Sequence, residues 1–428
     1  MICKRELVAT LPNNLLPRRH DYRLDRKTFS KDLIAGVTVA VVALPLALGF
    51  GITSGASAAA GLTTAIIAGF LAAIFGGSKY QVSGPTGAMT VILLPIIHSY
   101  GINAIPFLGL IAGAMVILMA ILRLGRIINR VPWSVVEGFT AGIAFVIALQ
   151  QLPLVFGIKK GEGERSLVVA WHTIKNAFSL GINWTSISIV VLTLAVKFTY
   201  PALARRLKIG FHVPASFVAI VISLGVVQIF SLKINTIGNI PRNVGTWQGK
   251  TIIASDVTHL LWPAFLIAIL CAIESLLSAR VADGMVHTTT QEQYHPNREL
   301  FGQGIATAAA SLFGGLPATG AIARSSVNVR AHAQTRMAAM LHAAVLLFVA
   351  LLAAPLVGHI PAAAIAGVLL GTSYRILNPR SLKESLQTTK GEATVLVVTA
   401  VATLAIDLIW GIGIGIVLYA VVHFKKKN

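Results

Sequence analysis

The chain has 428 residues, of which 55% are hydrophobic and only 12% are charged. Apolar segments must therefore follow one another almost end to end, which is typical of an all-α polytopic membrane protein. The net charge of +20 would suit a nucleic-acid partner, but the basic residues gather between apolar runs and at both ends, as in positive-inside loops. This distribution excludes nucleic acid as an expected partner and favours a lipid bilayer.

Apolar segments of about the 20 residues that cross a bilayer occur about fourteen times. They lie near 33–52, 56–75, 82–98, 103–123, 133–151, 184–200, 212–232, 259–281, 300–314, 319–332, 337–358, 361–377, 391–407 and 408–424. The amphipathic stretch 164–180 is either interfacial or spanning. The connection from Lys233 to Asp256 contains Gly, Pro and Asn and predicts an exposed loop.

Both ends of the chain are basic. Residues 1–31 lack the short apolar region and cleavage site of a signal peptide, so they are predicted to be a cytoplasmic leader. Residues 425–428 form a second basic end. An even number of crossings places both ends on one side, and their charge makes that side the cytoplasm of a bacterial inner membrane.

Two breaks of small residues and proline interrupt the apolar pattern at matching positions. Phe75-Gly-Gly77 precedes Ser83-Gly-Pro-Thr-Gly-Ala88, and Phe313-Gly-Gly315 precedes Pro317-Ala-Thr-Gly-Ala321. The breaks lie at the third and tenth segments, seven segments apart, so the two halves form an inverted repeat of seven segments each. Such paired breaks indicate a substrate site.

Each break is predicted to begin a half-helix, at Thr86-Gly-Ala88 and Thr319-Gly-Ala321. Two helix N-termini would then offer free N–H groups and partial positive charge near the middle of the membrane. Such a site prefers an anion. The alternative is that the glycines only allow close helix packing.

Three polar residues inside apolar segments are candidates for the chemistry of transport. Arg324 follows the second break, where a charge costs about 2.5 to 3.5 kcal/mol, and it would supply a positive field for an anion. Glu274 is a candidate carrier of a proton or sodium ion, and Ser278 lies one turn further on the same face. A purely structural Glu274–Arg324 ion pair is the open alternative.

Other polar residues give weaker indications. Glu137 and Asp407 lie at segment ends and are expected to make interfacial or loop contacts. The histidines show no metal-ligand spacing, and no nucleophile elbow, P-loop or metalloprotease helix is present, so neither an enzyme nor a cofactor is expected.

Six motifs in order resemble the SulP (sulfate permease) family of anion transporters, which includes the animal solute-carrier sulfate and anion exchangers. They are Ala43-Leu-Pro-Leu-Ala-Leu-Gly-Phe-Gly51, Ser83-Gly-Pro-Thr-Gly-Ala88, Val136-Glu-Gly-Phe-Thr-Ala-Gly142, Ile273-Glu-Ser-Leu-Leu-Ser-Ala-Arg-Val-Ala-Asp283, Asn297-Arg-Glu-Leu-Phe-Gly-Gln-Gly304 and Phe313-Gly-Gly-Leu-Pro-Ala-Thr-Gly-Ala321. The resemblance covers the chain from Asp32 to Phe424.

The resemblance implies a uracil-transporter-like fold with a transporter domain at 32–424. Its core domain would comprise about 32–123 and 259–358, and its gate domain about 131–232 and 361–424. The core would move against the gate as an elevator. The C-terminal STAS domain usual in the family is expected to be missing.

The resemblance also implies roles for single residues. Thr86, Gly87, Ala88, Gly320, Ala321 and Ile322 would line the anion site together with Arg324. Glu274 would take the coupling position, with Ser278 below it. In similar sodium-coupled bicarbonate members these two places hold Asp and Thr, so Glu and Ser favour a proton. Leu46 after Pro45, where many members have Gln, is in contrast a feature of the bicarbonate type.

The expected function is therefore secondary active transport of a small inorganic anion, with sulfate:proton symport first and sodium-coupled bicarbonate uptake as the alternative. A passive anion channel or exchanger and a nucleobase–proton symporter are more distant alternatives. The expected partners are the anion, the coupling proton or sodium ion and the bilayer. Whether the chain also forms a homodimer is left open.

Overall fold

The computed structural model describes residues 15–17, 22, 25–128, 130–163, 165–207, 213–248, 257–286, 293–406 and 408–427. Most of the predicted leader at 1–31, Asp407 and Asn428 of the basic end lie outside these residues. The described chain is almost entirely helical, and it splits into two compact units, each built from two stretches of sequence. The roles of core and gate for these units stay a prediction.

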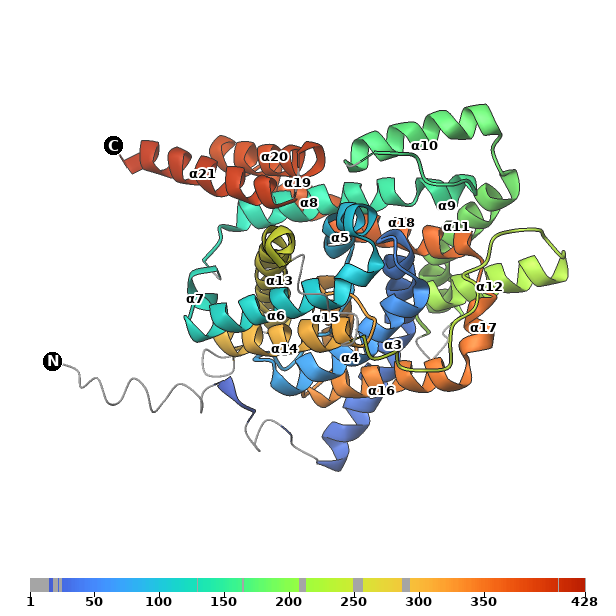
Figure 1. Ribbon diagram of the computed structural model, residues 1–428, viewed down its shortest axis with the longest axis horizontal. Coiled ribbons are helices and arrows are strands. Elements are labelled where there is room, and N and C mark those ends of the chain that lie inside the picture. The colour runs from blue at the N-terminus through green and yellow to red at the C-terminus, as the bar shows by residue number, and fades with distance from the viewer. Residues whose placement is uncertain are drawn as a thin grey trace. The chain divides into compact units, whose positions relative to one another are not determined.

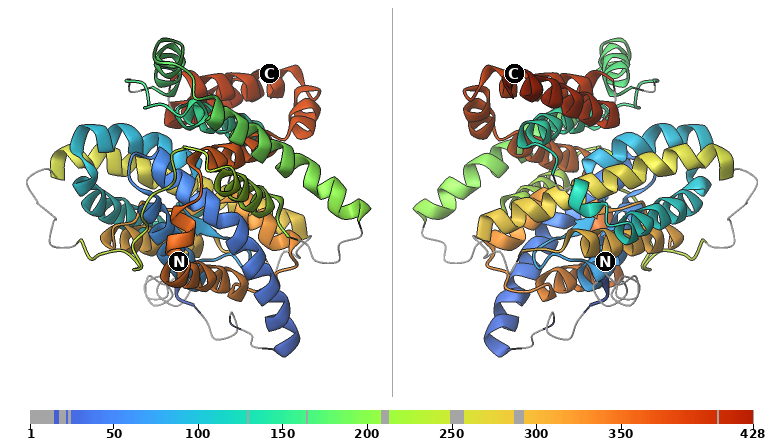
Figure 2. Two further views of the ribbon diagram at one scale, coloured as in Figure 1. Left: turned by 90° about the vertical axis from the view of Figure 1, so that its right-hand side faces the viewer. Right: turned by 90° about the vertical axis from the view of Figure 1, so that its left-hand side faces the viewer.

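Unit one comprises Met1–Arg130 and Pro241–Ala353. Its elements are α3 (Arg26–Thr53), α4 (Ala58–Phe75), β1 (Ser83–Gly84), α5 (Gly87–Tyr100), the 3₁₀ turn η2 (Ile102–Ala104), α6 (Ile105–Ile121), α7 (Gly125–Ile128), α13 (Val257–Val286), α14 (Pro296–Leu312), β2 (Thr319–Gly320), α15 (Ile322–Arg330) and α16 (Met337–Leu352). Figure 2 shows the long helix α13 in yellow over most of its length.

Unit two comprises Val131–Ile240 and Ala354–Asn428. Its elements are α8 (Trp133–Gln150), α9 (Leu152–Phe156), α10 (Ser166–Leu180), α11 (Trp184–Arg206), α12 (Ala215–Ile229), α17 (Ala354–Gly358), α18 (Ala362–Leu377), α19 (Pro379–Leu386), α20 (Lys390–Ala405) and α21 (Leu408–Lys427). Helix α8 packs on α20, and α11 packs on both α12 and α18 (Figure 1).

Small residues bring the helices of unit one close together. A Cβ atom on Gly113 of α6 would lie 2.6 Å from the carbonyl oxygen of Gly304 on α14, so the two backbones are in direct contact there. Gly51 and Gly61 meet in the same way between α3 and α4. Close backbone approach through small residues is the usual packing of membrane helices, because lipid supplies no hydrophobic drive to associate.

Each of the fourteen predicted segments overlaps a helix. Among the described residues, six helices are long and apolar enough to cross a membrane. They are Arg26–Thr53, Ala58–Phe75, Ile102–Ile121, Trp133–Phe156, Trp184–Arg206 and Thr258–Val286. The number of crossings therefore stays a prediction, and α10, over the amphipathic stretch, is not among these six.

The predicted exposed loop makes more contacts than expected. At its start, the N–H of Gly238 donates to the carbonyl oxygen of Gly358 within unit two. Further along, the N–H of Gln248 donates to the carbonyl oxygen of Leu312 within unit one, and Trp247 packs edge-on against Phe313 at 5.3 Å between ring centroids. Residues 249–256 lie outside the described part.

Candidate functional site

The two breaks meet in unit one through a short antiparallel ladder. Ser83 pairs with Gly320, and Gly84 pairs with Thr319. Because paired strands run in opposite directions, α5 and α15 both begin next to the ladder and lead away from it in opposite senses. The ladder therefore pairs Thr319–Gly320 of the second break with Ser83–Gly84, which precede Thr86 in the first break.

Thr86 lies outside the ladder and caps the helix that follows it. Its backbone is extended, and its hydroxyl accepts from the N–H of Met89 at 3.4 Å, so it is the N-cap of α5. In the first half of the chain, the motif Thr86-Gly-Ala88 therefore marks the start of helix α5.

The backbone donors of the two helix starts differ in availability. Gly320 donates its N–H to the hydroxyl of Ser275 at 3.0 Å, and Ala321 donates to the carbonyl oxygen of Val82 at 3.0 Å. In the described part of the chain, no hydrogen bond occupies the N–H groups of Gly87, Ala88 or Ile322. These three are among the donors that the helix starts leave free.

Glu274 of α13 reaches the ladder with one carboxylate oxygen. Its Oε2 accepts from the hydroxyl of Thr86 at 2.9 Å and from that of Thr319 at 2.6 Å. The two threonine hydroxyls lie 3.1 Å apart. No hydrogen bond from a described residue reaches Oε1, and the side chain is only partly buried. A single carboxylate thus contacts both breaks.

Arg324, in the first turn of α15, is fully buried. Its Nη2 donates to the carbonyl oxygen of Pro85 at 2.5 Å, whereas Nε and Nη1 find no hydrogen-bond partner among the described residues. Arg324 therefore makes no hydrogen bond to Glu274, and the structural pair considered from the sequence is not formed in this conformation. Buried, unpartnered N–H groups are costly, so they favour a ligand or water at this point.

Ser278 lies away from the carboxylate of Glu274. Its hydroxyl lies 3.1 Å from that of Ser325, which accepts from the N–H of Val82 at 3.0 Å. These contacts join α13, α15 and the residue preceding β1. Spacing along a helix predicted a common face for Glu274 and Ser278, but it did not predict which neighbour each would contact.

Sequence reasoning missed Glu299, which organises the first break. Its Oε2 accepts from the N–H groups of Gly77 and Ser78, each at 2.8 Å. Its Oε1 accepts from the side-chain amides of Gln81 at 2.8 Å and Gln303 at 2.9 Å. The segment prediction at 300–314 placed Glu299 in a loop, whereas α14 begins at Pro296 and buries it.

Two charged side chains of unit two make hydrogen bonds to neighbouring helices. Glu137 accepts from the hydroxyls of Ser381 at 2.7 Å and Ser385, both on α19. Lys197, which the sequence analysis did not single out, is buried and donates to the carbonyl oxygen of Val368 at 2.5 Å and the hydroxyl of Thr372 at 2.8 Å.

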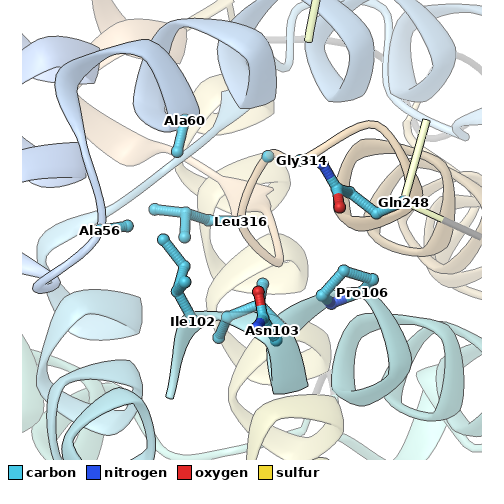
Figure 3. Close-up of a pocket in the computed structure, with 10 residues that line it drawn as sticks. Ala56, Ala60, Ile102, Asn103, Pro106, Gln248, Gly314 and Leu316 are labelled. Carbon is cyan, nitrogen blue, oxygen red and sulfur yellow. The ribbon is translucent and has the colours of Figure 1, made fainter. Parts of the chain in front are cut away.

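A cavity of about 120 Å³ lies beside the second break (Figure 3). It is lined by Ala56, Ala60, Ile102, Asn103, Ile105, Pro106, Gln248, Gly314, Gly315 and Leu316. None of these residues is a predicted anion ligand. The cavity is therefore a separate hollow on the segment that leads into β2.

Within the described residues, no group of three or more His, Cys, Asp or Glu side chains could hold a metal ion. The polar atoms at the ladder are instead free N–H groups, an arginine and one carboxylate. Apolar helices broken at two points that meet around such groups are the arrangement of a membrane transport protein.

Comparisons with known proteins agree with this class. The profile of the Sulfate permease family matches residues 29–399. The putative sulfate transporter YvdB of Bacillus subtilis is 36% identical over 405 residues, which cover 94% of this chain and 74% of the relative. The bicarbonate transporter BicA of Synechocystis is 32% identical over 407 residues, which cover 93% of this chain and 70% of the relative. The chain belongs to the sulfate permease family of anion transporters.

Solved structures show the same fold. The transmembrane domain of a cyanobacterial bicarbonate transporter BicA superposes with a TM-score of 0.81 at 29% identity, covering 91% of this chain and 99% of that one. The murine Solute Carrier 26 family member A9 anion transporter has a TM-score of 0.83 at 15% identity. The match covers 100% of this chain and 73% of that one.

Proposed function

We propose that this chain is a sulfate:proton symporter of the bacterial inner membrane, with both ends in the cytoplasm. The observation that carries the proposal is the contact of Glu274 with Thr86 and Thr319. A carboxylate that takes up a proton is there hydrogen bonded to a residue of the anion site. Protonation and anion binding then cannot be independent.

The anion site comprises Thr86, the free N–H groups of Gly87, Ala88 and Ile322, and Arg324. Gly320 and Ala321 shape it through their backbone without donating to the anion, since Ser275 and Val82 occupy their N–H groups. Two helix starts and a buried guanidinium favour a dianion over a monoanion, because electrostatic attraction grows with ligand charge. The relative YvdB, named as a putative sulfate transporter, supports the same choice.

The coupling ion is proposed to be a proton. Bound hard cations take several oxygen ligands, yet Ser278, the residue expected below Glu274, contacts Ser325 instead. A proton needs only the carboxylate. Glu274 can take up a proton on its own carboxylate, without any further oxygen ligand.

Sodium-coupled bicarbonate uptake is the second candidate. It is favoured by Leu46, which is buried on α3 directly after Pro45, and by the BicA relatives. For either substrate, unit one, which holds the whole candidate site, would carry the anion as an elevator relative to unit two.

Uptake of radiolabelled sulfate and bicarbonate into proteoliposomes, under separately imposed proton and sodium gradients, tests the proposal. An inward proton gradient is expected to drive sulfate above its equilibrium level. Accumulation of bicarbonate with sodium alone would establish the second candidate. Equilibration without accumulation under any gradient would indicate a passive channel and contradict both.

A further inference from the structure

Thr319 contacts both the coupling carboxylate and Thr86 of the anion site. Its hydroxyl is fully buried, 2.6 Å from Oε2 of Glu274 and 3.1 Å from the hydroxyl of Thr86. A threonine hydroxyl has one hydrogen and two acceptor lone pairs. Thr319 can therefore donate to only one of these two neighbours at a time.

With Glu274 ionised, both threonine hydrogens point to the carboxylate. Thr86 donates at 2.9 Å and Thr319 at 2.6 Å, because an ionised carboxylate only accepts. Thr86 then has no hydrogen left to donate to an anion. It would present only lone pairs to the substrate, and these repel an anion.

With Glu274 protonated on Oε2, the hydrogen bonds among these three side chains can rearrange. The carboxyl O–H donates to Thr319, and Thr319 donates to Thr86. The oxygen of Thr86 then accepts from Thr319 and from the N–H of Met89, which fills both its lone pairs. Its own hydrogen becomes available beside the free N–H groups of Gly87 and Ala88.

We propose that Thr319 and Thr86 form a hydroxyl switch, in which protonation of Glu274 turns the hydrogen of Thr86 from the carboxylate to the anion. One proton is gained at Glu274, and no covalent bond other than its O–H bond is formed. The inference rests on the proposed proton coupling. Thr319 acts as a positioning residue, since it transmits protonation without donating to the anion.

The switch predicts a coupling between pH and affinity that depends on Thr319. For one linked proton, the affinity for sulfate can rise by up to about tenfold for each unit of falling pH. Thr319→Val keeps the shape of the side chain but removes one hydroxyl of the switch, so the affinity should depend less strongly on pH. The dependence that remains comes from the loss of negative charge at Glu274 itself. Thr319→Ser keeps the hydroxyl and should keep the pH dependence.

The experiment measures binding of radiolabelled sulfate, and separately of bicarbonate, to the purified full chain at about pH 6 and about pH 8. Wild type and Thr319→Ser are expected to gain the same factor in affinity at the lower pH, and Thr319→Val a smaller factor. Thr319→Ala repeats the test if the valine variant does not elute as a folded protein. A gain in the folded hydroxyl-free variant as large as that of wild type would overturn the switch.

The proposed function fails separately from the switch. If wild type accumulates neither anion under a proton gradient and its affinity does not change with pH, proton coupling is wrong, and the switch is overturned with it. If wild type shows both effects and the folded hydroxyl-free variant keeps both at the wild-type size, only the switch is wrong.

Discussion

Arg324 donates from Nη2 to the carbonyl oxygen of Pro85 at 2.5 Å, so a side chain from one break is fastened to the backbone of the other. Its Nη1 packs against Gly84, where a Cβ atom would collide with it. The guanidinium of Arg324 thus both joins the two breaks and supplies positive charge. Substitutions at Gly84 and at Arg324 distinguish these two effects.

Gly84→Ala should abolish sulfate uptake and lower the thermal midpoint of the purified protein. The added methyl would displace Nη1 of Arg324, and it would lie 3.2 Å from Cζ, at a residue with φ +155°. Uptake and thermal unfolding in detergent measure the two effects.

Gly101→Ala is the matched control for Gly84→Ala. Its φ is +75°, but no atom lies within 4 Å of the added carbon. It should cost only the backbone strain of about 1 to 3 kcal/mol and keep transport. Equal loss in both variants would show that strain, and not the contact with Arg324, decides the result.

Arg324→Ala should weaken sulfate transport more than bicarbonate transport. The lost attraction scales with ligand charge, so we expect a loss of about tenfold or more for a dianion and a smaller loss for a monoanion. Arg324→Lys should restore part of the charge but not the planar fork that reaches Pro85. Equal losses for both anions, measured as kcat/KM of uptake, would identify a purely structural arginine.

Glu274→Gln should abolish accumulation driven by a proton gradient while leaving anion exchange partly intact. The amide oxygen can still accept from Thr86 and Thr319, but the side chain cannot take up a proton. Counterflow of labelled anion measures exchange without a gradient. Concentrative uptake by this variant would remove Glu274 from the coupling step.

Glu299→Gln should destabilise unit one by about 2 to 4 kcal/mol, because the carboxylate is buried and accepts four hydrogen bonds. The amide oxygen can still accept from the backbone N–H groups of Gly77 and Ser78, but the NH₂ group then faces the side-chain amides of Gln81 and Gln303, which lose their acceptor unless they flip. Thermal unfolding in detergent measures the loss.

Glu137→Gln is the control for Glu299→Gln. Glu137 is also bonded by two donors, but both are serine hydroxyls that can rotate to accept from an amide. Its thermal midpoint should change little. A similar fall in both variants would mean that loss of charge alone destabilises the chain.

The polar residues of the candidate site could be predicted from the sequence more completely than the residues to which they hydrogen bond. Glu274 and Arg324 stand out because a charge in an apolar segment is costly, and both breaks stand out because glycine and proline interrupt the helix pattern. The ladder between them could not be predicted, since strands of two residues leave no alternating pattern to detect.

Threonines and serines were the hardest residues to assign. Ser275 and Ser325 are ordinary residues for a membrane helix, and only the fold shows that each contacts a break. Thr319 was expected at a helix start, and its contact with Glu274 was not foreseen. Glu299 was overlooked for another reason. The apolar pattern of α14 begins after it, although the helix itself begins at Pro296.

The ladder gives the site a local two-fold symmetry in its backbone that its side chains do not share. An antiparallel pair exchanges its two strands by a half turn, which places Ser83 on Thr319 and Gly84 on Gly320. The fifth residue after Thr319 is Arg324, and the fifth after Ser83 is Ala88. The positive charge of the site therefore lies on one side of the two-fold axis. An anion between the two helix starts would be attracted away from the axis toward α15. A non-spherical anion would bind there in one preferred orientation.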